Sequence, residues 1–120
     1  MANFKSAKLT QDTYTKVGTV EIPITGLEGM DVSNEDRLSF NFYNAGATSD
    51  VIKVYGKLGS TAGTVTLPSD MWTQIGDDIT VAATSSSLKS IATTGLNFVG
   101  VTITPGTGSN TIAWAILRQA

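Results

Sequence analysis

The chain of 120 residues contains no histidine and no cysteine. Without histidine, the common Ser-His-Asp triad and imidazole-based acid–base catalysis are impossible. Without cysteine, thiol nucleophiles, disulfides and thiolate metal sites are excluded as well. These absences point away from the most frequent enzyme mechanisms, and we expect a protein that has no catalytic activity and no cofactor.

Charge is also scarce. Only 15% of the residues are charged, and the net charge is −2. This balance provides no basic surface for a phosphate backbone, so we expect no nucleic-acid partner. No run approaches the ~18 apolar residues of a membrane-spanning helix, and the first residues lack the apolar core of a signal peptide. We therefore expect no membrane partner and synthesis in the cytoplasm of the cell.

What the chain does contain is short runs of alternating apolar and polar residues, punctuated by Ser, Thr and Gly. Residues 38–43 are the clearest example, because every second residue is Leu or Phe. Residues 51–58 repeat the pattern and place Leu58 on the predicted core face. Seven or eight such short strands in a chain of one-domain length are typical of an all-β fold, an antiparallel β-sandwich or barrel.

The final third of the chain predicts a β-hairpin. Residues 97–104 and 111–118 have strand character, and the intervening residues 105–110 are rich in turn-forming Gly, Pro, Ser and Asn. The side of the last strand opposite its predicted core face is unusually apolar: Ala113, Ala115 and Leu117. This strand is therefore either central and covered on both sides, or it has one face that meets another subunit.

Two segments are not predicted as strands. Residues 69–76 are ambiguous and include a candidate single turn of helix. Residues 84–91 are predicted as a loop or short helix, from which Leu88 and Ile91 point inward.

The first residues differ in character from the rest. Residues 1–16 are predicted as an N-terminal arm or edge strand, and residues 17–120 as the β-sandwich domain. The arm carries three lysines and one acidic residue, whereas residues 21–36 carry five acidic residues and no basic ones. The two stretches are either ordinary solvated surface, or the basic arm complements an acidic patch on a neighbouring copy or on a partner.

Acidic residues suggest two further kinds of site. The adjacent carboxylates Asp77-Asp78 and Glu35-Asp36 are interpreted as solvated turn residues rather than a glycosidase pair, because neighbouring strand residues point to opposite faces. Residues 31–36 supply oxygen ligands of the kind that calcium prefers, without the spacing of an EF-hand loop. An acidic loop without a metal is our expectation, and a bound calcium ion is the alternative.

Aromatic side chains are the remaining candidates for a binding surface. Trp114 lies in an apolar strand and is predicted to be in the core. Tyr43 and Tyr55 are predicted on the outer faces of adjacent strands, where they would pair and form a patch suited to a protein or a glycan. The candidate contact residues are Phe4, Lys5, Lys8, Tyr14, Tyr43, Tyr55 and Trp72.

The chain resembles small β-sandwich proteins of the virions of tailed bacteriophages. The resemblance rests on four segments: 38–44, 51–56, 71–75 and 102–112. Within that class, a chain of this size without catalytic residues is similar to capsid decoration, or cement, proteins. The resemblance implies a homotrimer on the capsid exterior that contacts the major capsid protein and bridges its subunits.

Two hypotheses about function remain open. A decoration protein should bury Trp72 and expose an apolar face elsewhere. A carbohydrate- or receptor-binding module of a phage tail, the alternative, should expose the Trp72 indole beside polar groups.

Overall fold

A computed structural model describes residues 7–15, 18–59, 71–107 and 111–120. Every regular element in these residues is a β-strand, which confirms the all-β class. The strands in chain order are β1 (Ala7–Thr15), β2 (Ile22–Pro23), β3 (Met30–Asp31), β4 (Arg37–Asn44), β5 (Asp50–Lys57), β6 (Thr73–Gln74), β7 (Ile79–Val81), β8 (Ser85–Ala92), β9 (Phe98–Thr104) and β10 (Thr111–Gln119).

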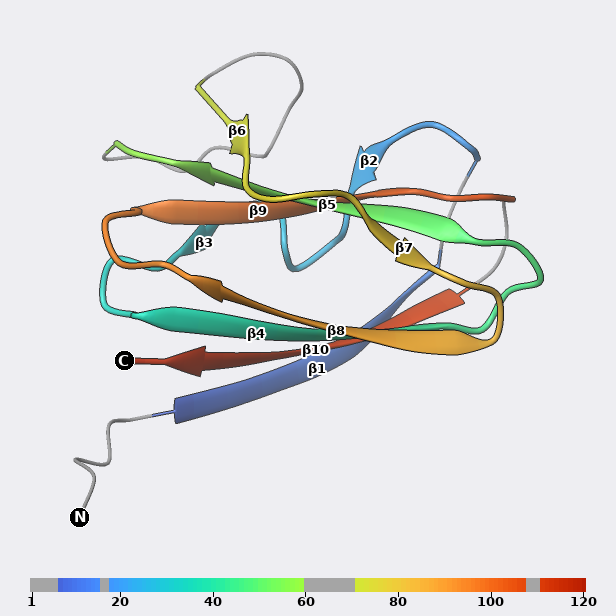
Figure 1. Ribbon diagram of the computed structural model, residues 1–120, viewed down its shortest axis with the longest axis horizontal. Coiled ribbons are helices and arrows are strands. Elements are labelled where there is room, and N and C mark those ends of the chain that lie inside the picture. The colour runs from blue at the N-terminus through green and yellow to red at the C-terminus, as the bar shows by residue number, and fades with distance from the viewer. Residues whose placement is uncertain (1–6, 16–17, 60–70, 108–110) are drawn as a thin grey trace.

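The strands form two antiparallel sheets that face each other as a β-sandwich (Figure 1). The four-stranded sheet has the order β1-β10-β4-β8. The six-stranded sheet follows the path β2-β9-β5-β6, with β3 also paired to β9 and β7 also paired to β5. Within the described ranges, no helix has the length and apolar character needed to cross a membrane.

The hydrophobic core lies between the sheets and follows the alternation of the sequence. In β4, Phe40 and Phe42 are fully buried, and their stacked rings have centroids 5.9 Å apart. Trp114 of β10 is buried in the same core, as the sequence predicts. The facing sheet contributes further fully buried aliphatic residues: Ile52, Val99, Val101 and Ile103. Burial of these large apolar side chains supplies the main stabilisation of a domain of this size.

The predicted C-terminal hairpin is wrong. Both strands exist, but β9 pairs with β5 in one sheet, whereas β10 pairs with β4 and β1 in the other. The connection that follows β9 is anchored to the start of β5, since Gly106 N–H donates to Asp50 Oδ1 at 3.0 Å. A Cβ at Gly106 would lie 2.3 Å from the carbonyl oxygen of Ser49, so only glycine fits there. The chain therefore crosses between the sheets instead of turning back within one.

The prediction of a loop or short helix over residues 84–91 is also wrong. Residues 85–91 belong to β8, which pairs with β4 along its whole length. Ile91 is buried as predicted, whereas Leu88 is 77% exposed. The two side chains are three residues apart, a spacing that shares one face of a helix but opposite faces of a strand.

Two further expectations need correction. The candidate helical turn is replaced by β6, which pairs with β5 at residues Tyr55 and Gly56; residues 69 and 70 of that segment lie outside the described residues. Leu58 follows the end of β5 and is exposed instead of buried.

Candidate interaction surface

The central part of the outer face of the four-stranded sheet is an exposed surface without charged residues. Arg37 lies in the adjoining row, and its Nη1 donates to Ser90 Oγ at 3.0 Å. The strand registers align three rows of four residues across β1, β10, β4 and β8. We call these twelve residues the open face: Leu9, Leu117, Ser39 and Ser90; Gln11, Ala115, Asn41 and Leu88; Thr13, Ala113, Tyr43 and Ser86. None of them is charged and none is fully buried.

The open face also concentrates exposed apolar side chains. Leu9, Tyr43 and Leu88 are 62%, 44% and 77% exposed, and they account for three of the six large apolar residues that the described chain exposes. Solvent-exposed apolar groups gathered on one uncharged face are typical of a surface that meets a partner.

A shallow concavity of about 440 Å³ lies in the middle of the open face. Its floor is formed by Ala113 and Ala115 of the central strand β10, whose small side chains leave space between longer neighbours. Gln11, Asp12 and Thr13 of β1 line one side, and Asn41 and Tyr43 of β4 line the other. No described residue covers the apolar side of β10 noted in the sequence, and Ala113, Ala115 and Leu117 are all partly exposed. Within the described residues the strand is therefore covered on one side only.

The edge of the open face is β1, the segment that contains most of the predicted arm. It hydrogen-bonds to β10 along its nine residues. Every residue of β1 is exposed except Tyr14, which is half-buried and packs against the core. Both faces of β1 are thus accessible to solvent along most of the strand.

The outer face of the six-stranded sheet is partly covered instead, although Thr80 of β7 remains exposed on it. Tyr55, Trp72 and Phe98 form a second buried cluster there, which we call the aromatic cluster. The Lys57 ammonium lies over the Trp72 ring, 5.3 Å from its centroid, a cation–π distance. These residues stabilise the fold and leave little aromatic surface for a ligand.

Two partly buried hydrogen bonds hold the aromatic cluster in place. Tyr55 Oη donates to Glu21 Oε2 at 2.8 Å, and Thr102 Oγ1 donates to the same oxygen at 2.6 Å. Desolvation and the Glu21 carboxylate together raise the pKa of Tyr55 to about 12. The phenol therefore remains a neutral donor over the physiological pH range.

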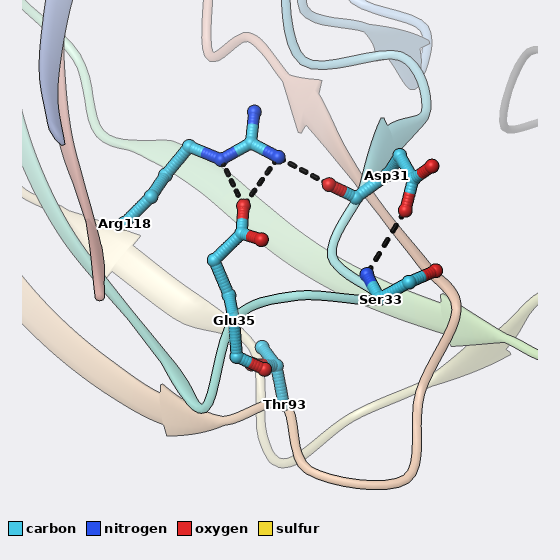
Figure 2. Close-up of polar contacts among 5 residues, drawn as sticks. All are labelled: Asp31, Ser33, Glu35, Thr93 and Arg118. Atoms are coloured by element: carbon cyan, nitrogen blue, oxygen red, sulfur yellow. Dashed lines mark hydrogen bonds and ion pairs between the residues drawn. The ribbon is translucent and has the colours of Figure 1, made fainter. Parts of the chain in front are cut away.

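The acidic stretch 31–36 is organised by an arginine (Figure 2). Arg118 Nε of β10 donates to Glu35 Oε1 at 2.5 Å, and Nη2 forms an ion pair with the same oxygen at 2.5 Å. Nη2 also donates to the carbonyl oxygen of Asp31. The Asp31 carboxylate accepts the Ser33 N–H at 2.9 Å, which lowers the pKa of Asp31. Thr93 Oγ1 donates to the Glu35 carbonyl oxygen. The loop thus joins the ends of the two sheets. Among the described residues, no three acidic side chains lie close enough together to bind a metal ion.

The structure separates the predicted contact residues. Tyr43 lies on the open face, whereas Tyr55 belongs to the other sheet, so the predicted pairing of these two tyrosines is wrong. Trp72 is buried, with 6% of its surface exposed.

Lys8 and Tyr14 lie on β1, on the side of the strand opposite the open face. Phe4 and Lys5 lie outside the described residues. Sequence reasoning missed most of the open face. Eight of its twelve members are Ser, Thr, Gln, Asn or Ala residues, which form a surface only when four strands align them.

Comparisons with known proteins support the fold. A scan against protein-family models gives no match, and a search of the curated proteins gives none either. Among solved structures, the chain is similar to the SPBc2 prophage-derived protein YomS, at 14% identity and a TM-score of 0.57, with all of both chains covered.

Two further solved structures share the fold. A protein of the disulfide-linked pili of Bacillus endospore appendages has 18% identity and a TM-score of 0.54, with 100% of this chain and 95% of that chain covered. The Tobacco streak virus coat protein has 9% identity and a TM-score of 0.56, with 99% and 88% covered. At these identities the likeness establishes a small β-sandwich and nothing finer.

Proposed function

We propose that this protein is a non-enzymatic structural subunit of a phage virion, which decorates the exterior of the capsid and bridges subunits of the major capsid protein. The observation that carries the proposal is the open face. It offers three aligned rows of uncharged side chains, none of which is fully buried. The central concavity over Ala113 and Ala115 is a recess that accommodates side chains of a partner.

The composition of the open face suits a protein partner. Interface cores are depleted in charged residues and enriched in aromatic ones, because burying an unpaired charge is costly. Tyr43 and the two exposed leucines supply apolar area, while Ser, Thr, Asn and Gln supply hydrogen-bonding groups around it. A surface of this kind can be buried against a capsid subunit at small desolvation cost.

The solved structures that share the fold add support of a general kind. They include a prophage-derived protein and the coat protein of a plant virus. A fold alone does not determine a function, but the same architecture on virus-related proteins agrees with the resemblance found in the sequence.

The burial of Trp72 argues against the rival hypothesis. A carbohydrate-binding module stacks sugar rings on exposed aromatic faces, whereas Trp72 is enclosed with Tyr55 and Phe98. Tyr43 is the sole aromatic residue of the open face, so that face does not form an aromatic platform.

The proposal is tested on particles of the phage that encodes the chain. Virions purified from wild-type phage should contain the protein, and particles made without its gene should rebind purified protein. Ala115→Arg should abolish rebinding, since it fills the concavity and places a charge at its centre. Leu88→Arg, at a more exposed position, should weaken rebinding without any packing cost.

The matched control is Thr80→Arg, which adds the same charge at an exposed position of β7 in the other sheet. It should rebind like the wild type, and thermal unfolding should show that all three variants fold. Absence of the protein from purified virions, or equal rebinding by folded open-face variants and the control, would overturn the proposal.

A further inference from the structure

The outer edge of β1 has no neighbouring strand among the described residues. β1 ends the four-stranded sheet, and on the side away from β10 no described strand lies beside it (Figure 1). Its nine residues include neither proline nor glycine, the residues that commonly interrupt an edge. A long edge strand of this kind presents unpaired N–H and C=O groups to another chain.

The hydrogen bonds of the neighbouring strands show which groups of β1 point outward. The carbonyls of Thr111 and Gln119 in β10 accept from the N–H groups of Ala45 and Asp36, which flank β4. Odd-numbered residues of β10 therefore bond toward β4, and even-numbered ones bond toward β1, as antiparallel pairing requires. Since even-numbered residues of β1 pair with even-numbered residues of β10, the odd-numbered residues of β1 direct their backbone groups to the free edge.

The central outward groups of β1 belong to Leu9 and Gln11. The next outward amide, that of Thr13, donates to the adjacent Asp12 Oδ1 at 2.8 Å, which agrees with its pointing away from β10. Lys8 and Asp12 are both exposed and lie on the same face of the strand, on either side of Thr10.

We propose that β1 pairs antiparallel with β1 of a second copy, about a two-fold axis at Thr10. Leu9 then lies opposite the partner subunit's Gln11, and each such pair exchanges two backbone hydrogen bonds. Lys8 lies opposite the partner subunit's Asp12 in a non-hydrogen-bonded pair, whose Cα atoms are about 4.5 Å apart and whose side chains are therefore close. By symmetry the dimer contains this opposite-charge pair twice.

Charge selects this register among the two-fold alternatives. An axis at Leu9 or Gln11 places no opposite charges face to face. An axis at Lys8 or at Asp12 places two lysines or two aspartates opposite each other, which is destabilising. Only the axis at Thr10 pairs both charged residues of β1 favourably.

The pairing joins the two four-stranded sheets into one continuous sheet. A two-fold axis that relates antiparallel strands is perpendicular to the sheet, so both open faces lie on the same side of it. The inference replaces the homotrimer implied by the resemblance with a dimer, and it holds whether or not the chain belongs to a virion.

Sedimentation equilibrium over a concentration series tests the dimer with four proteins: wild type, Lys8→Asp, Asp12→Lys and the double variant Lys8→Asp/Asp12→Lys. Each single variant places like charges opposite each other twice, and its dimer dissociation constant should rise about tenfold or more. The double variant restores opposite charges with their positions exchanged, so its dissociation constant should return toward that of the wild type. Raising the salt concentration should weaken the wild-type dimer.

A backbone variant tests the edge itself. Gln11→Pro removes an outward N–H without removing a bond to β10, so the monomer should fold while the dimer is lost, whereas Gln11→Ala should dimerise normally. A wild-type protein that remains monomeric or forms trimers, a double variant as weak as the single ones, or a folded Gln11→Pro variant that dimerises normally would each overturn the inference.

Discussion

The two outer faces of the sandwich are built by the same alternation of side chains, yet one is partly covered and the other is not. On the six-stranded sheet, the outward residues Tyr55 and Phe98 are buried together with Trp72. On the four-stranded sheet, the outward residue Tyr43 remains exposed beside alanines and hydroxyl-bearing residues.

One outer face therefore contributes mainly to the stability of the monomer, and the other mainly to binding. An aromatic side chain that is already enclosed stabilises the monomer and has little surface left for a partner. An exposed one stabilises the monomer little and retains its apolar area for an interface. We therefore expect substitutions on the covered face to change the free energy of unfolding, and substitutions on the open face to change association.

The largest expected change in stability comes from a substitution in the aromatic cluster of the covered face. Phe98→Ala should lower the free energy of unfolding by about 3 kcal/mol, because it leaves a cavity beside Tyr55 and Trp72. Tyr43→Ala, which also removes an aromatic ring but from the open face, should lower it by less than about 1 kcal/mol. Urea denaturation of both variants measures the difference, and equal losses would contradict the distinction between the two faces.

A smaller effect comes from the hydrogen bond beneath the covered face. Tyr55→Phe should lower the free energy of unfolding by about 1.5 kcal/mol at neutral pH, because Glu21 loses a donor in a partly buried position. The pKa of Tyr55 is about 12 in the folded protein, against 10.0 ordinarily. Because the folded state holds this proton more tightly, the contribution is fully present below pH 10 and is lost as the pH rises toward 12.

The measurement is the difference in unfolding free energy between wild type and Tyr55→Phe from pH 8 to pH 12. The difference should be constant up to about pH 10 and should shrink above it. Tyr43→Phe controls for the general effect of alkaline pH, since its phenol lies on the open face. A difference in unfolding free energy that stays constant to pH 12 would contradict the role assigned to the Glu21 carboxylate.

Sequence alternation predicted which residues of a strand share a face, but not which strands are neighbours. The core positions of β4 were evident because Leu38, Phe40 and Phe42 alternate with polar residues. The pairing of Tyr43 with Tyr55 failed because β4 and β5 follow each other in the chain but belong to different sheets. A loop long enough to turn within one sheet is also long enough to cross to the other.

The same limit explains why the open face was only partly foreseen. The apolar side of the last strand indicated an unfinished surface, but Ser39, Ser86 and Ser90 carry no such signal individually. They become part of a surface through strand register, which depends on tertiary pairing rather than on local sequence. The burial of Trp72 was likewise undetermined, because it rests on contacts with β5 and β9.

The smallest expected effect concerns two residues of a single strand. Leu88 and Ile91 both belong to β8, but Leu88 lies on the open face at 77% exposure and Ile91 is buried in the core. Leu88→Ala should change the free energy of unfolding by no more than about 0.5 kcal/mol, whereas Ile91→Ala should lower it by about 2 kcal/mol or more. A helix would bury both residues on one face and make both substitutions costly. Comparable losses in urea denaturation would therefore contradict β8, and with it the four-stranded sheet that aligns the open face.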